Sequence, residues 1–248
     1  MNKSGWRTLI SSIEDAAPFY DSVNEIISFG RASRVRTYAA RELLENGRPQ
    51  LILDSGAGPG NMSAILLERD ADAHVVALDY SIQFLETCRK RLTTYRDRVH
   101  FVRGCFEDLP FKSSSFDAAV TAYALRNCPD LDQAIVEYAR SIKKGGCLAV
   151  AELAKPDNMI KRSFAVIYVR FVAPLIAKLI ISGRLRGNPW RMIAPTYRNL
   201  PTTHRLLKMF EARFEVLEKR EFLAGGMLVM LLRSLGEDPS WSSSLAQS

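Results

Sequence analysis

The sequence contains few of the residues that build disulfide frameworks and metal sites. Its four cysteines lie far apart and form no Cys-x-x-Cys pair, and its three histidines show no ligand spacing. Neither a zinc site nor a disulfide framework is indicated, so a reducing cytoplasm fits best and no metal is expected. The first residues include no apolar run of signal-peptide length, which argues against secretion.

Acidic residues are almost absent from one stretch of the chain. Between Lys161 and Arg213 there are 11 Lys or Arg and a single acid, Glu211, although the whole chain has 34 basic and 27 acidic residues. This stretch therefore carries a local charge of +10 within a net charge of +7, and the remainder is mildly acidic. Such a segment can serve RNA, a membrane surface or an anionic substrate, or it can simply be a solvated face.

Alternating strand and helix patterns indicate the fold. The 248 residues are 47% hydrophobic and 25% charged, which is typical of a soluble globular protein with one large domain. Apolar runs predict strands at 51–55, 74–79, 99–102, 117–122 and 147–152, with two closing strands at 214–217 and 227–231. Helices are predicted at 131–142 and 203–212, and Lys144-Gly145-Gly146 is predicted to turn the chain. The expected fold is α/β, a doubly wound, Rossmann-like, seven-stranded and mostly parallel sheet.

The turn after the first strand carries the strongest local signal. Its glycines follow the spacing Asp54-x-Gly56-x-Gly58-x-Gly60, and Asn61 stands where a dinucleotide fingerprint requires a third glycine. This pattern looks like the S-adenosyl-L-methionine loop of class I methyltransferases. A carboxylate at the strand end suits the cationic amino-acid end of that cofactor better than a pyrophosphate. The alternative is a glycine-rich turn that closes an ordinary α/β unit.

A second acid follows the second predicted strand. Asp79 lies 19 positions after Gly60, where an acid in a doubly wound sheet accepts hydrogen bonds from ribose hydroxyls. Tyr80 follows and is expected to lie against the adenine. The alternative for Asp79 is an acid in a surface turn.

Five groups of residues together resemble the ubiquinone/menaquinone biosynthesis C-methyltransferase family (UbiE/MenG type) over roughly residues 19–232. They are Tyr20-Asp21-x-x-Asn24-x-x-x-Ser28-Phe29-Gly30; Asp108-Leu109-Pro110-Phe111 with Phe116-Asp117; Leu125-Arg126-Asn127 with Lys144-Gly145-Gly146 and Glu152-Leu153-x-Lys155-Pro156; Tyr197-x-x-Leu200-Pro201; and Leu223-x-Gly225-Gly226. The resemblance implies methylation of a ring carbon on a lipophilic quinol. Cofactor-binding residues are then expected at Asp54, Gly56, Gly58, Pro59, Gly60, Asp79, Tyr80, Cys105, Phe106 and Ala122, and acceptor-binding residues at Tyr20, Asn24, Tyr123, Tyr168 and Tyr197.

Three of these positions depart from the family pattern. Cys105 stands where the family usually has Asn or Asp to read the adenine amino group, and a thiol is a poor acceptor. Adenine is then expected to be held by backbone groups and by Phe106. Ala122 and Pro59 stand where Ser and Thr are frequent in the family. The cofactor assignment stands, whereas the identity of the quinol is less constrained.

The resemblance divides the single domain into N-terminal helices (1–46), a cofactor-binding core (47–156), a helical cap (157–200), a C-terminal helix and strands (201–234) and a tail expected to be disordered (235–248). The N-terminal helical layer begins near residue 13 and resumes at Arg34 after Gly30.

In the cap, residues 164–181 are apolar nearly all round. Arg170 and Lys178 would each cost about 2.5–3.5 kcal/mol near a bilayer centre, and Pro174 is expected to break the helix. The segment is therefore a poor membrane span. It is either a buried core helix or a cap over an apolar chain, with arginines near anionic lipid head groups.

Arg126 and Asn127 follow the fourth strand, where the transferred methyl group should lie, and are the candidate catalytic residues. Arg126 stays protonated and cannot act as a base, but it can stabilise a developing quinolate oxygen while Asn127 fixes the loop. Alternatively, Arg126 is structural and bonds to a carboxylate or carbonyl.

Other functions also stay open for the whole protein. They are methylation of a different lipid, sterol or polyketide, transfer to a hydroxyl, or a non-catalytic RNA-binding or assembly role. The lack of an Asn/Asp-Pro-Pro-aromatic run argues against nucleobase amines, so no nucleic acid is expected. Peripheral contact with an anionic membrane and homo-oligomers stay open.

Overall fold

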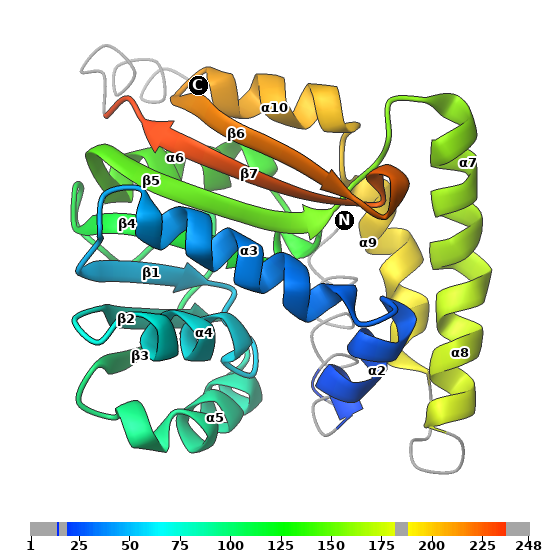
Figure 1. Cartoon of the computed structure of the whole chain (residues 1–248), viewed down its shortest axis with the longest axis horizontal. Helices are drawn as coiled ribbons and strands as arrows, with labels where there is room; N and C mark the ends of the chain where they lie inside the picture. Colours follow the sequence, from blue (N-terminus) through cyan, green and yellow to red (C-terminus); the bar gives the residue numbers. More distant parts are fainter. Residues whose placement is uncertain (1–13, 15–18, 182–187, 237–248) are drawn as a thin grey trace.

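One seven-stranded sheet runs through the protein, with the strand order β3-β2-β1-β4-β5-β7-β6 (Figure 1). The computed structural model describes residue 14 and residues 19–181 and 188–236. The strands are β1 Leu51–Ser55, β2 His74–Asp79, β3 Val99–Arg103, β4 Phe116–Ala122, β5 Ile142–Leu153, β6 Phe214–Phe222 and β7 Met227–Ser234. The first five pair in parallel, whereas β7 runs antiparallel to both β5 and β6. The predicted doubly wound, mostly parallel sheet is confirmed.

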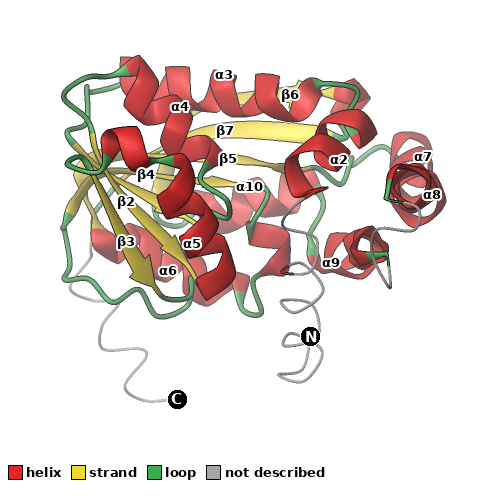
Figure 2. Ribbon diagram, turned by 90° about the horizontal axis from the view of Figure 1, so that it is seen from below, coloured by secondary structure: helices red, strands yellow, loops and turns green. Residues whose placement is uncertain are grey.

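Helices cover both faces of this sheet (Figure 2). They are α2 Tyr20–Ile27, α3 Arg31–Glu45, α4 Asn61–Arg69, α5 Ile82–Arg91, α6 Leu131–Ser141, α7 Met159–Ile167, α8 Ala173–Ile180, α9 Ile193–Asn199 and α10 Thr203–Glu211. In β1, Ile52 belongs to the apolar core under α3 and α4, and its neighbour Leu53 belongs to the core under α6 and α10. Because successive side chains point to opposite faces, a strand covered on both sides must be apolar throughout. This explains the uninterrupted apolar runs of the central strands.

Strand β5 is longer than predicted. It begins at Ile142 and includes Lys144-Gly145-Gly146, which was expected to be a turn. Its pairing with β4 shifts between Phe116 and Ala118. A Cβ at Gly146 would lie 2.3 Å from the carbonyl oxygen of Asp117. The turn prediction is therefore wrong, because these glycines form an irregularity inside the strand where the two backbones approach closely.

The N-terminal layer consists of two helices, with the interruption near Gly30 that the sequence predicts. They separate at Phe29 and Gly30, which have φ values of 54° and 69°, and α3 begins at Arg31, three residues earlier than predicted. Asp21 fastens α2 to the core, since it accepts a hydrogen bond from Asn61 Nδ2 (2.6 Å) and pairs with Arg91. The predicted start near residue 13, apart from Glu14, and the tail from residue 237 onward lie outside the described residues.

The cap lies beyond the carboxyl ends of the parallel strands (Figure 1). Helices α7 and α8 form one continuous helix, Met159–Ile180, joined by a π-helical turn at Tyr168–Val172. The predicted break at Pro174 is wrong. Proline lacks an N–H and its ring collides with the carbonyl four residues earlier, and the wider turn just before Pro174 accommodates both without ending the helix.

This continuous helix is only partly buried. About 22% of its most apolar window is buried, so the reading as a buried core helix is wrong. By length and composition alone it is long and apolar enough to cross a membrane, with a mean hydropathy of 1.8. Arg170 and Lys178 therefore do not exclude it on those criteria, contrary to the sequence expectation. Its inner face packs on α2 and α9, around Ala173, Ala177 and Val169.

Candidate active site

The glycine loop joins β1 to α4 at the carboxyl edge of the sheet. Gly56, Gly58 and Gly60 have φ values of 76°, 54° and 86°, which other residues rarely adopt. A Cβ at Gly56 would lie 2.4 Å from Cβ of Ala124. The amides of Gly56 and Ala57 donate to the carbonyl of Leu78 at 2.8 and 3.0 Å, which holds the loop against β2. Close packing and backbone conformation therefore both require the predicted glycines.

Asp54 lies beneath this loop with one carboxylate oxygen unsatisfied. The residue is 1% exposed, and its Oδ2 accepts a hydrogen bond from Ser63 Oγ at 2.6 Å. Oδ1 has no hydrogen-bond partner within the described part of the chain. Burial raises the pKa of Asp54 to about 6, and the hydrogen bonds from Ser63 offset only part of this rise. A buried, unpaired carboxylate oxygen suits a cationic ligand group such as an ammonium.

Asp79 closes the end of β2 with both oxygens facing backbone donors. Its Oδ2 accepts from the amide of Gly58 (2.8 Å) and its Oδ1 accepts from the amide of Ser81 (2.9 Å). Burial raises the pKa of Asp79, and these two amides act in the opposite direction. Each carboxylate oxygen has more than one lone pair, so Asp79 can also accept hydrogen bonds from a pair of ribose hydroxyls.

A cleft along this edge brings the predicted cofactor residues together. Its walls include Asp54, Gly56, Gly58, Pro59, Asp79, Tyr80, Cys105, Phe106 and Ala122. Gly60 is the one predicted cofactor residue outside the lining. It is the N-cap of α4, where a Cβ would lie 2.6 Å from Cys88 Sγ, so its role is to let α4 pack on α5. Tyr80 lies in the wall with the Arg103 guanidinium 5.2 Å from its ring centre.

Two N-terminal residues contact α5 and its N-cap residue Ser81 beside this cleft. The ring of Tyr20 packs edge-on against Phe84 with centroids 5.4 Å apart, and Ser81 Oγ donates to Glu14 Oε1 at 2.7 Å. The remaining space is about 80 Å³, whereas pockets for small ligands usually hold several hundred.

Arg36 is a functional candidate that sequence reasoning missed. It is 8% exposed, its guanidinium lies 5.0 Å from the ring centre of Tyr123, and Glu25 Oε1 is 4.0 Å away. It lines the cofactor cleft and also the larger cavity beside it. A cation and the Asp54 carboxylate in one cleft match a zwitterionic amino-acid group. The available signal was a charged residue on the buried stripe of α3, which otherwise reads Ala32, Val35, Ala39, Ala40 and Leu43.

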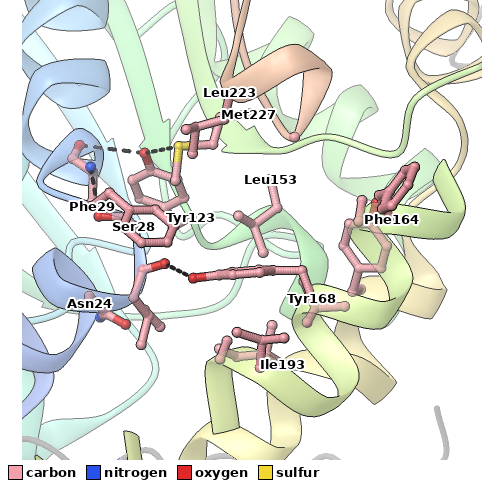
Figure 3. Close-up of a pocket in the computed structure, with 18 of the residues that line it drawn as sticks. Asn24, Ser28, Phe29, Tyr123, Leu153, Phe164, Tyr168, Ile193, Leu223 and Met227 are labelled. Atoms are coloured by element: carbon pink, nitrogen blue, oxygen red, sulfur yellow. Dashed lines mark hydrogen bonds between the residues drawn. The ribbon is translucent and has the colours of Figure 1, made fainter. Parts of the chain in front are cut away.

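A second cavity, of about 540 Å³, adjoins the cleft and is predominantly apolar (Figure 3). All five predicted acceptor residues line it, namely Tyr20, Asn24, Tyr123, Tyr168 and Tyr197. Its walls come from α2, the ends of β4 and β5, the α7–α8 helix, α9 and the turn before β7. Tyr20, Arg36 and Tyr123 line both spaces, so a ligand in the cavity would meet a ligand in the cleft at these three side chains.

Three of the four tyrosines that line this cavity have hydroxyls engaged with backbone carbonyls. Tyr168 donates to the carbonyl of Ile27, and Tyr197 donates to the carbonyl of Ala154 at 2.8 Å. Tyr123 contacts the carbonyl of Ala32 at 3.4 Å (Figure 3). Burial raises the pKa of all three phenols, that of Tyr197 to about 12. These residues therefore present ring surfaces to a ligand and are unsuited to act as bases at neutral pH.

Backbone strain concentrates around the same cavity. Six described non-glycine residues have positive φ, and four of them line it: Phe29, Tyr123, Leu223 and Ala224. Each such conformation costs of order 1–3 kcal/mol and persists only where its surroundings hold it. The segments around Phe29 and Leu223, which carry part of the family resemblance, thus form walls of this cavity in conformations that their surroundings must hold.

Arg126 has the partners that its structural alternative requires. Its Nη1 donates to Glu152 Oε1 at 2.9 Å and to the carbonyl of Tyr123, and its amide donates to Glu152 Oε2 at 3.2 Å. Glu152 is fully buried, and the Arg126 side chain is 12% exposed. Nevertheless Arg126 lines the apolar cavity, and its buried Nε has no hydrogen-bond partner in the described structure. Asn127 lines the cofactor cleft instead. The two candidate catalytic residues therefore face different spaces.

The sheet order, the glycine loop and the two adjoining spaces define a class I methyltransferase that uses S-adenosylmethionine. The residues fit this cofactor: Asp54 offers an unsatisfied oxygen for its ammonium, Arg36 a cation for its carboxylate, and Asp79 acceptors for its ribose. The profile of the ubiE/COQ5 methyltransferase family matches residues 7–231, and the chain belongs to this family.

Individual relatives agree with this assignment. The chain is 27% identical to a demethylmenaquinone methyltransferase of Chlamydia caviae, over 94% of this chain and 98% of that protein. It is 31% identical to the ubiquinone/menaquinone biosynthesis C-methyltransferase UbiE of Syntrophotalea carbinolica, over 86% and 88%. Among solved structures, a 1,6-didemethyltoxoflavin-N1-methyltransferase of Burkholderia thailandensis shares the fold, with a TM-score of 0.62, 18% identity and coverage of 94% and 91%.

Proposed function

We propose that this enzyme methylates a ring carbon of a lipophilic quinol of the ubiquinone or menaquinone type. The observation that carries the proposal is the apolar cavity of about 540 Å³ that meets the cofactor cleft at Tyr20, Arg36 and Tyr123. Aromatic walls suit a flat ring, and the volume suits a ring with the first part of an apolar tail. The names of the relatives support the same acceptor class.

The chemistry places modest demands on the protein. The cofactor supplies a methyl group on a sulfonium centre, and a quinol ring carbon ortho to a hydroxyl is nucleophilic, more so once that hydroxyl loses its proton. The walls must align the two partners and exclude bulk water. The stacked apolar side chains around Leu153, Tyr168 and Ile193 suit that task (Figure 3).

The phenolic proton has no obvious protein acceptor in this cavity. Its described lining contains neither a carboxylate nor an imidazole, and Arg126 stays protonated. We therefore assign Arg126 the role of stabilising the quinolate oxygen while water carries the proton away. Glu152 holds the guanidinium in place, so the charge is preorganised before the acceptor binds. The side-chain amide of Asn24 is a further polar group in the cavity lining, and its Oδ1 accepts a hydrogen bond from Trp190 Nε1 at 3.0 Å.

The test uses purified protein, S-adenosylmethionine with a ¹³C-labelled methyl group, and reduced naphthoquinols and benzoquinols with short, soluble tails. The expected product carries the label on a ring carbon, as shown by its carbon chemical shift and mass. Label on oxygen would assign O-methylation, and transfer only to sterol or polyketide extracts would assign another lipid. Cofactor binding without transfer to any acceptor would favour a non-catalytic protein.

We place the enzyme in the cytoplasm as a peripheral membrane protein, since tailed quinols reside in membranes.

A further inference from the structure

The α7–α8 helix carries large apolar side chains on its outside. Six residues at helical spacing form this outer stripe, and their exposed fractions are Ile160 69%, Phe164 68%, Ile167 51%, Phe171 60%, Leu175 58% and Leu179 71%. Their spacing of three or four residues places them along one side of the helix. Figure 1 shows this helix at the edge of the molecule, beyond the rest of the cap. An apolar surface of this extent in a soluble protein marks an interaction site.

The inner face of the same helix is apolar as well. It includes the buried Val169, Ala173 and Ala177, and the larger Tyr168, Ile176 and Ile180 pack beside them. A helix of a water-soluble protein normally presents polar residues on the side opposite its buried face. The outer stripe instead presents large apolar side chains where packing within the domain does not use them.

The charges beside the stripe identify the partner. The exposed charged residues of the helix are Lys161, Arg170 and Lys178, and the sequence has no acid from Met159 to Ile181. Long cationic side chains can bury their stems in an apolar layer and keep their charges among phosphates. A protein partner would need an acidic apolar groove, whereas an anionic bilayer offers both an apolar layer and negative head groups over the whole length of the helix.

The stripe is continuous with the acceptor cavity. Phe164 and Ile167 belong to the outer stripe and also line the cavity, and the exposed side chains of Phe29 and Leu223 lie in the same lining. An apolar tail that leaves the cavity between these residues would remain in contact with apolar surface. This step rests on the proposed function, because it requires an acceptor with a lipid tail.

We infer that the outer stripe of the α7–α8 helix lies in the head-group region of an anionic bilayer, parallel to its surface, and opens the acceptor cavity toward the lipid. The helix lies on the membrane and does not span it. Its inner face is committed to the domain through Ala173, Ala177 and Val169, so a spanning helix would have to leave the acceptor cavity without a wall.

Vesicle binding tests the inference. The intact protein is sedimented with vesicles of phosphatidylglycerol and phosphatidylcholine, and with phosphatidylcholine alone. Leu175→Gln/Leu179→Gln removes two outer residues that do not line the cavity. The matched control, Ile82→Gln/Leu235→Gln, removes two aliphatic residues that are 51% and 49% exposed elsewhere. We expect the first variant to lose at least about tenfold in partitioning and the control to bind normally.

Charge and depth are tested separately. Arg170→Gln/Lys178→Gln should weaken binding to the anionic vesicles, and raising salt from about 0.05 M to about 0.5 M should weaken the wild type likewise. Bound protein should be released by alkaline carbonate. Unchanged partitioning of Leu175→Gln/Leu179→Gln would overturn the inference. Release of the bound protein by detergent only would also overturn it, because that result indicates a helix that spans the membrane. If the wild type is a dimer without vesicles and this variant is a monomer, the outer stripe binds a second copy of the protein and the inference is likewise overturned.

A soluble acceptor separates this inference from the proposed function. With a short-tailed quinol in solution, the Leu175→Gln/Leu179→Gln variant should turn over within about twofold of the wild type. With a long-tailed quinol in vesicles, its turnover should fall in parallel with partitioning. Failure of the wild type on every quinol would refute the proposed function, even if its vesicle binding behaves as expected.

Discussion

The pair of Arg126 and Glu152 offers a direct test of how the methyl transfer is assisted. Replacing Arg126 with Met leaves the buried Glu152 carboxylate with only the backbone amides of Arg126 and Leu153 as donors. Breaking a buried ion pair in this way typically costs 3–5 kcal/mol. For a chain of this length, 1 kcal/mol shifts the Tm by about 2–4 °C, so we expect the Tm to fall by roughly 10 °C.

That loss of stability would hide any catalytic effect, and a second substitution separates the two. In Arg126→Met/Glu152→Gln no unpaired charge remains, and the introduced side-chain amide keeps an acceptor for one backbone N–H. We expect most of the Tm and the affinity for S-adenosylhomocysteine to return. Methyl transfer to a soluble quinol should stay about a hundredfold or more below the wild type, because the charge facing the quinolate is lost.

The matched control is the ion pair of Arg140 and Glu137. The distance from Arg140 Nη2 to Glu137 Oε2 is 2.7 Å, and neither residue lines the cavity. Arg140→Met/Glu137→Gln should change stability without slowing transfer. If Arg126→Met/Glu152→Gln instead regains both stability and turnover, Arg126 only holds the loop after β4, and its assignment to the quinolate is wrong.

Four further predictions concern the cofactor cleft. Because burial raises the pKa of Asp54 to about 6 and an ammonium ligand needs its ionised form, affinity for S-adenosylhomocysteine should fall about tenfold from pH 7.5 to pH 5 in calorimetry, and Asp54→Asn should abolish this dependence. The stability of the free protein should run the other way: the contribution of Asp54 is fully present below about pH 4 and is lost as the pH rises through about 6. Asp79→Ala should weaken the binding of S-adenosylhomocysteine by about 1.5–3 kcal/mol. Unchanged affinity in the folded variant would show that Asp79 is not part of the cofactor site. Arg36→Met should lower the affinity for S-adenosylhomocysteine at least about tenfold and leave the affinity for its decarboxylated analogue unchanged. Equal losses of affinity for both ligands would show that Arg36 does not bind the carboxylate.

Local sequence determined the sheet and most of the cofactor cleft. Strand and helix periods, glycine spacing and the position of Asp79 after β2 depend on near neighbours in the chain, and a doubly wound sheet brings the carboxyl ends of its strands to one edge. The structure accordingly gathers Asp54, Asp79 and Phe106 around one cleft. Gly60 matched the spacing but serves packing against Cys88, because a pattern does not distinguish a glycine that faces a ligand from one that faces a helix.

Contacts between distant segments were decided by the tertiary structure alone. The sequence left Arg126 between two roles, and only folding places Glu152, 26 positions later, against its guanidinium. Arg36 is a site residue because the fold places this position of α3 in the walls of both the cleft and the cavity. For the α7–α8 helix the sequence could not say which side packs inward, since its residues are apolar nearly all round and the hydrophobic period carries no direction. The tertiary structure buries Val169, Ala173 and Ala177, and this leaves Phe171 and Leu175 exposed to the surroundings.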